Sequence, residues 1–171
     1  MRFRALLAAC FVPLALAGCA LQPMYAGGAA GAAGQALANV SVAPIQGRAG
    51  WLVANELRDR LSVGQSGGGV DDDSARYRLE VRLDDQLEGF GLLNDDTIGR
   101  ERRTLRARYQ LIDTADDSIV LDATAGSDVG IDVVSSEYAV IAAEQTALER
   151  LAGEVADRVV TRIALLGRES Q

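Results

Sequence analysis

Apolar and charged side chains alternate without interruption over residues 77–84, and the alternation returns over residues 105–111. This pattern is typical of β-strands, because successive side chains point to opposite faces of a sheet. A shorter strand is predicted at 119–123 after a tight turn at 115–118, and residues 86–101 are expected to form an extended hairpin tip. The short connections favour antiparallel neighbours. The predicted buried face consists of Tyr77, Leu79, Val81, Leu83, Leu105, Ala107, Tyr109 and Leu111.

Two helical patterns accompany these strands. Residues 135–166 form a long amphipathic pattern that Gly153 could bend, and a helix laid on the sheet is favoured over a coiled coil. A short first strand is expected near residues 40–45. The order predicts an α+β fold: a two-layer sandwich whose four-stranded, mostly antiparallel sheet is packed by two helices. The first helix is predicted over 50–63, with a spacing of four on one face (Val53, Leu57 and Leu61) and Trp51 and Ala54 at its edge.

The N-terminal segment has the pattern of a bacterial lipoprotein signal. Two arginines precede an apolar run over residues 5–17, which is too short to span about 30 Å of hydrocarbon as a helix. The run ends in Leu-Ala-Gly-Cys at 16–19, which resembles a lipobox and favours lipidation of Cys19 with acyl chains such as palmitate over a chance cysteine. We expect residues 1–18 to be a cleaved signal peptide, 19–38 a lipidated Gly/Ala-rich tether and 39–171 the folded domain.

Composition narrows the possible chemistry. The chain carries a net charge of −7, which becomes 15 − 24 = −9 once the signal peptide and its two arginines are removed. Such an acidic chain is a poor general binder of nucleic acid. It contains no histidine, and Cys10 leaves with the signal peptide while Cys19 is consumed by lipid. These absences argue against most zinc sites and against Cys–His or Ser–His catalysis, so we expect no enzyme activity, catalytic residue, metal or cofactor.

Two further motifs have simpler explanations. The segment 64–68 matches G-x-S-x-G around Ser66, but a nucleophile elbow needs a preceding strand and a histidine base, so a Gly-rich loop is favoured. A periplasmic hydrolase that uses Ser66 remains the alternative enzyme hypothesis. The acidic run at 71–73 lacks the Gly and Glu of a calcium loop and is interpreted as a solvated segment.

The one basic concentration lies at 100–108. Strand alternation predicts that Arg102, Arg106 and Arg108 share a solvent-facing side, with Arg100 nearby. Because guanidinium groups bind phosphates through paired hydrogen bonds, these arginines are candidates for contact with an anionic lipid. The alternative is cross-strand ion pairing with acidic residues of the preceding strand (Glu80, Asp84 and Glu88).

Several short segments resemble one known family. Residues 19–25, Cys-Ala-Leu-Gln-Pro-Met-Tyr, look like its C-G-F-x-P-L-Y start, with departures at Ala20, Leu21 and Met24. Residues 77–81, 97–100 and 109–111 resemble its strands. Residues 136–139, Glu144, Ala147, 150–151, 156–157 and 161–163 resemble its C-terminal helix. The chain thus resembles the LPS-assembly lipoprotein family LptE, over most of the mature sequence.

The resemblance implies a role in the outer membrane, and Ala20 in place of Asp agrees with sorting there. Family members plug and help assemble the large β-barrel LptD, bind lipopolysaccharide (LPS) and assist its delivery to the outer leaflet. It implies an LptD-like barrel and LPS as partners, and LPS contact near the hairpin strands, which we assign to Arg100, Arg102 and Arg103, with Arg106 beside them. The alternative is an auxiliary lipoprotein of a lipid-transport ABC system, which would bind an inner-membrane or envelope-spanning partner.

Overall fold

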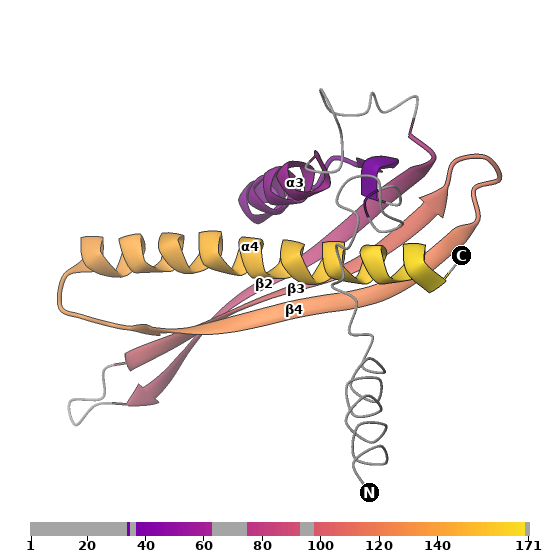
Figure 1. Ribbon diagram of the computed structural model, residues 1–171. Helices are drawn as coiled ribbons and strands as arrows, with labels where there is room; N and C mark the ends of the chain where they lie inside the picture. The colour runs from indigo at the N-terminus through magenta and orange to yellow at the C-terminus, as the bar shows by residue number, and fades with distance from the viewer. Residues whose placement is uncertain (1–33, 35–36, 63–74, 93–97, 170–171) are drawn as a thin grey trace, which may run out of the picture.

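The computed structural model of the chain describes residues 34, 37–62, 75–92 and 98–169. A four-stranded sheet carries two helices on one face, which confirms the predicted two-layer α+β sandwich (Figure 1). In chain order the elements are β1 (Val40–Val42), α3 (Gly47–Ser62), β2 (Tyr77–Leu92), β3 (Ile98–Asp113), β4 (Ile119–Asp132) and α4 (Glu137–Glu169).

The strands lie in sequence order, β1-β2-β3-β4. The short β1 runs parallel to β2, and the two later pairs are antiparallel, as expected for a mostly antiparallel sheet. The β2–β3 register places Leu83 opposite Ala107, and the β3–β4 register places Ala107 opposite Ala125. Paired residues of adjacent strands share a face, so one register decides which side chains meet along the whole sheet.

The strands are longer than their alternation predicts. The expected strand at 77–84 continues to Leu92, and the one at 119–123 continues to Asp132. The added part of β4 reads Thr-Ala-Gly-Ser-Asp-Val-Gly-Ile-Asp, whose small and polar residues carry little strand signal of their own. Its backbone nevertheless pairs with β3 throughout. The ladder between strands therefore extends the sheet where local sequence does not.

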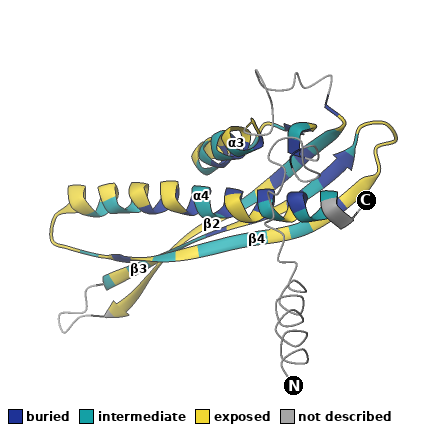
Figure 2. Cartoon of the chain, viewed as in Figure 1, coloured by how far each residue is buried: buried dark blue, intermediate teal, exposed yellow. Residues whose placement is uncertain are grey.

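The core lies between the sheet and the two helices. Buried side chains from β2 and β3 meet those of α4, and Leu79, Leu105 and Leu151 are completely enclosed. Burial is concentrated in the half where α3 also covers the sheet, whereas the first turns of α4 are mostly exposed (Figure 2). Leu37, expected in the tether, is buried in this core two residues before the expected start of the domain. Neither described helix combines the length and apolar character needed to cross a membrane.

Two glycines of the helices mark where each helix meets its neighbours. A Cβ at Gly50 would lie 2.6 Å from the carbonyl oxygen of Ile45, so the start of α3 packs tightly onto the segment that enters it. Gly153 does not interrupt α4, which runs unbroken from Glu137. Its missing side chain faces Arg60 of α3. The expected bend at this glycine is therefore absent, and the residue marks the contact between the two helices.

Candidate functional site

The four arginines proposed from the sequence lie on two different faces of β3. Leu105 and Ala107 are fully buried beneath the helices, so odd-numbered residues of β3 face the core and even-numbered ones face away. Arg100, Arg102 and Arg106 consequently lie on the open face of the sheet, which neither α3 nor α4 covers. Arg103 has the opposite parity and points toward α4. Arg103 therefore does not share a face with the other three arginines.

Arg103 is engaged in contacts within the domain. Its Nε and Nη2 donate to the two carboxylate oxygens of Asp85, at 2.9 and 2.7 Å, and its Nη1 donates to the backbone carbonyl of Glu144 at 3.0 Å. Only 16% of the Arg103 side chain and 26% of the Asp85 side chain are exposed. The hydrogen bonds to Asp85 raise the pKa of Arg103. The residue links β2, β3 and α4 and has little surface left for a ligand.

The outward arginines pair with β4 rather than with β2. Arg100 Nε lies 2.9 Å from Asp132 Oδ1, and Arg102 Nε lies 3.8 Å from Asp128 Oδ2. The alternative interpretation, that these arginines form cross-strand ion pairs, is therefore confirmed, but the partners expected on β2 were wrong. The register places Arg100 opposite Asp132 on β4. It also places Glu88 opposite Arg102 and Asp84 opposite Arg106 on β2, but the ion pairs form with the edge strand.

The far end of the open face combines basic and aromatic groups. The Arg102 guanidinium lies over the Phe90 ring, 5.2 Å from its centroid, and both side chains are exposed. We call Phe90, Arg100 and Arg102 the distal patch. Exposed apolar side chains occur at the same end of the chain's sheet but on its helix side: Leu87 opposite Arg103, Val134 before α4, and Tyr138 and Ile141 in the first turns of α4. Such an amphipathic end can contact a molecule with both anionic and aliphatic parts.

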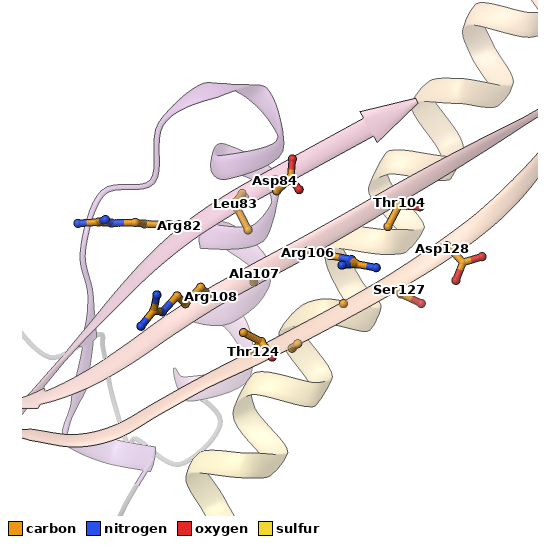
Figure 3. A pocket seen from close by; sticks show the side chains of 12 residues that line it. Arg82, Leu83, Asp84, Thr104, Arg106, Ala107, Arg108, Thr124, Ser127 and Asp128 are labelled. Atoms are coloured by element: carbon orange, nitrogen blue, oxygen red, sulfur yellow. The ribbon is translucent and has the colours of Figure 1, made fainter. Parts of the chain in front are cut away.

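A groove crosses the middle of the same open face. It measures about 530 Å³, within the range of ligand-binding sites, and it runs over β2, β3 and β4. Figure 3 shows the groove with both helices behind the sheet: Arg82 and Arg108 project in the same direction from neighbouring strands, and Arg106 extends along β3 toward Asp128. We call Arg82, Arg106 and Arg108 the central arginines.

Sequence reasoning did not identify Arg82 as part of a site. The alternation of 77–84 already placed it outward, but only the register shows that it lies directly opposite Arg108. Two guanidinium side chains in opposed positions repel each other, which is an unfavourable arrangement for the sheet alone. Arg108 is paired with Asp122 at 3.0 Å, whereas Arg82 and Arg106 make no ion pair with any residue that the structure describes.

Carboxylates on β4 and α4 are held in their charged form. Arg108, and then Gln110 at 2.9 Å, donate hydrogen bonds to Asp122 and hold the pKa of its carboxyl below the ordinary value. On the other side of the sheet, the Ser127 hydroxyl and then Arg150 do the same for the pKa of Glu154. These contacts tie α4 to β4 and fix the acidic edge of the open face.

Three other candidates fall outside what the structure describes. Cys19, Ser66 and the acidic run at 71–73 belong to the segments 1–33 and 63–74. In the described ranges, no three His, Cys, Asp or Glu side chains gather in a way that could hold a metal ion. The described surface therefore offers arginines as its distinctive chemistry, suited to binding anions.

Solved structures share this fold. A lipoprotein from Caulobacter crescentus CB15 matches with a TM-score of 0.65 and 23% identity, covering 82% of this chain and 98% of that one. Rare lipoprotein B from Shewanella oneidensis matches with a TM-score of 0.61 and 10% identity, over 77% and 96% of the two chains. A minor lipoprotein from Acinetobacter baumannii matches with a TM-score of 0.58 and 16% identity, covering 74% of this chain and 90% of that one. At these identities the likeness establishes the fold.

A family model provides the further evidence. Among the curated proteins, none matches the chain. The model for LptE, described as lipopolysaccharide-assembly, matches residues 37–163, from the first buried core residue to the last turns of α4. Since this match covers well over half of the chain, the protein belongs to the LptE family of lipopolysaccharide-assembly lipoproteins.

Proposed function

We propose that this protein is an outer-membrane lipoprotein that sits inside an LptD-like β-barrel, helps it assemble, and binds LPS for delivery to the outer leaflet. The observation that carries the proposal is the family match, which spans the whole sandwich rather than one motif. Lipidation of Cys19, after removal of residues 1–18, attaches the chain to the membrane. The role is one of binding and assembly rather than catalysis.

The open face of the sheet supports the plug role. Its three long strands present charged side chains in both signs, exposed to solvent along the whole face. The lumen of a large outer-membrane barrel is polar, so a rigid domain with a polar outer surface can be held inside it. The helix-covered face supplies the rigidity through its enclosed leucines.

Affinity isolation through a C-terminal tag tests the barrel partner. The full lipidated chain should recover one large outer-membrane β-barrel in stoichiometric amount. A tagged version with Cys19→Ser, which cannot be lipidated, serves as control for the contribution of the anchor. Recovery of no barrel by the wild-type chain, or recovery of an inner-membrane permease complex instead, would overturn the proposal.

The distal patch is the proposed LPS contact. Arg100 and Arg102 are exposed and adjoin Phe90, so phosphate groups and aliphatic chains can be contacted together. Arg103 is left out because Asp85 and α4 occupy its guanidinium, and Arg106 lies about 13 Å from Arg102 along the strand, in the central groove.

Charge reversal at the distal patch tests this contact. The double substitution Arg100→Glu with Arg102→Glu should weaken LPS binding at least about tenfold, because two charge-assisted contacts are lost. The matched control is Arg78→Glu, a partly exposed arginine of the same face that is also ion-paired, with Glu80 and Asp117. Equal LPS binding by all three proteins, with unchanged circular dichroism, would exclude the distal patch.

A further inference from the structure

We infer that the central arginines form a second anion site, which binds a phosphate monoester between Arg82 and Arg108 in the groove on the open face. The site lies in the middle of the sheet, apart from the distal patch. It rests on the proposed function only for the source of the phosphate, a glycolipid headgroup. The site itself follows from the positions and pairing of side chains that the structure describes.

The first argument is the unbalanced charge of Arg82. It stands opposite Arg108 in the ladder, where an acidic residue would pair favourably. Of the acidic residues nearest along β2, Glu80 pairs with Arg78 at 3.2 Å. Asp84 lies opposite Arg106 at the border of the groove and accepts hydrogen bonds from the amide of Gln86 at 3.1 and 3.3 Å. A doubly charged phosphate placed between the two guanidinium groups removes their repulsion and accepts hydrogen bonds from both.

The second argument is the shape of the groove. Arg82 and Arg108 also border a smaller hollow, shared with Glu80 and Gln110, so this pair stands between two depressions of the surface. On the other side, Gly126 lies opposite Arg106. A Cβ at Gly126 would approach the Cγ of Arg106 to 3.1 Å, so the glycine lets the arginine stem lie across β4 and keeps the groove floor open. Arg106 supplies a further guanidinium at that end.

The third argument is the direction from which an anion can approach. The outward positions of β4 hold the acidic residues Asp122, Asp128 and Asp132, which repel a phosphate. No described acidic side chain lies within ion-pair distance of Arg82 or Arg106. On β2, Glu80 and Asp84 flank Arg82, so an anion is favoured only between Arg82 and Arg108 and is disfavoured over β4. This selects Arg82 and Arg108 as the principal contacts.

Two probes distinguish the possible sources of the phosphate. The first is inorganic phosphate, titrated into the full lipidated chain in detergent while the Nε–Hε resonances of arginine are followed by NMR. The second is a phosphatidylcholine vesicle containing bisphosphorylated lipid A, compared with a vesicle containing its dephosphorylated form. Perturbation of Arg82 and Arg108 but not Arg78 is expected with both phosphate probes. A much tighter response to phosphorylated lipid A identifies the headgroup as the source, and an equal response identifies free phosphate.

Substitutions at Arg82 distinguish a role in phosphate binding from a role in the stability of the fold. Arg82→Gln should weaken binding of inorganic phosphate at least about tenfold, whereas Arg78→Gln should change it less than about twofold. Arg82→Glu should abolish binding and yet raise the unfolding temperature, because the new carboxylate pairs with Arg108 across the strands. A residue with a purely structural role would instead lower it. Binding should also weaken with ionic strength, since the site is exposed.

Three results would overturn the inference. The first is unchanged phosphate affinity in Arg82→Gln and in Arg82→Glu. The second is an equal response of the arginine resonances to chloride. The third is loss of barrel capture by Arg82→Glu with an unchanged phosphate titration, which assigns this face to the protein partner. Failure of the proposed function has a different signature: the wild-type chain recovers no barrel, whatever the phosphate titration gives.

Discussion

Replacement of Arg103 by alanine is expected to destabilise the domain without weakening its binding of LPS. The substitution removes two charge-assisted hydrogen bonds to Asp85 and one to the backbone of α4. It also leaves the partly exposed Asp85 carboxylate without its cation. Arg103 thus joins the strand pair to the helix at the end of the molecule that α3 does not cover.

The expected magnitude follows from the burial of the pair. An exposed ion pair contributes about 0–1 kcal/mol, and truncating one partner of a fully buried pair costs about 3–5 kcal/mol. With side chains 16% and 26% exposed, the Arg103–Asp85 pair lies between these limits. After allowance for solvent screening, Arg103→Ala should lower the free energy of unfolding by about 2–3 kcal/mol, which corresponds to about 6–9 °C in Tm for a domain of this size.

Urea denaturation followed by circular dichroism measures this effect. A double-mutant cycle with Asp85→Ala should give a coupling of about 1–2 kcal/mol, because the two residues contact each other directly. Arg102→Ala is the matched control: its side chain is 56% exposed and its Nε lies 3.8 Å from Asp128, so a loss below about 0.5 kcal/mol is expected. Additive single effects, or equal losses for the two arginines, would refute the assignment of different roles to neighbouring residues.

Other substitutions probe the packing and the pH response of the fold. Gly153→Ala should stabilise the protein by about 0.5–1 kcal/mol in urea denaturation, since a Cβ there makes only ordinary contacts and alanine favours the helix; a loss would show a closer helix approach. Gly50→Ala should cost about 2 kcal/mol or more in the same assay because its Cβ would meet the carbonyl of Ile45, and a neutral effect would contradict that contact. Leu151→Ala, at a fully enclosed position, should cost about 3–4 kcal/mol, and a cost below about 1 kcal/mol would place Leu151 outside the core. The contacts of Glu154 lower the pKa of its carboxyl, so its contribution to stability is complete above the ordinary glutamate pKa and is lost as the pH falls through the folded-state pKa. Glu154→Gln should therefore make the decline of Tm in acid less steep. An unchanged dependence of Tm on pH would show that these contacts do not stabilise the fold.

The sequence predicted the faces of the strands but not their neighbours. Alternation assigns each residue of 77–84 and 105–111 to a side, and the enclosed Leu79 and Leu105 confirm those assignments. It also implies that Arg103, two residues before Leu105, faces the core, although the cluster of basic residues suggested a common role. The face of the sheet to which a strand residue points is therefore a better guide to a shared site than proximity in sequence.

The ion-pair partners could not be predicted because register is a property of two strands at once. A shift of one residue between β3 and β4 would turn Asp128 and Asp132 to the other face and leave Arg100 and Arg102 without partners. The segment that fixes this register, residues 124–132, has small and polar side chains and was not expected to be a strand. Its pairing is decided by the β3 backbone alongside it and by α4, whose Glu154 accepts hydrogen bonds from Ser127 and from Arg150.

On the open face, the charged side chains differ in sign from strand to strand. The outward positions of β3 carry four arginines, Arg100, Arg102, Arg106 and Arg108, and those of β4 carry three aspartates, Asp122, Asp128 and Asp132. β2 carries both signs, with Arg78 and Arg82 among Glu80, Asp84 and Glu88. Each aspartate of β4 pairs with one arginine of β3, so the edge strand neutralises three of the four guanidinium groups and leaves Arg106. Arg82 of β2 likewise has no ion-pair partner among the described residues, although Glu80 and Asp84 flank it along the strand. The anion site proposed on this face of an acidic chain therefore rests on the direct opposition of Arg82 and Arg108, because acidic residues flank that pair on β2 as well as on β4.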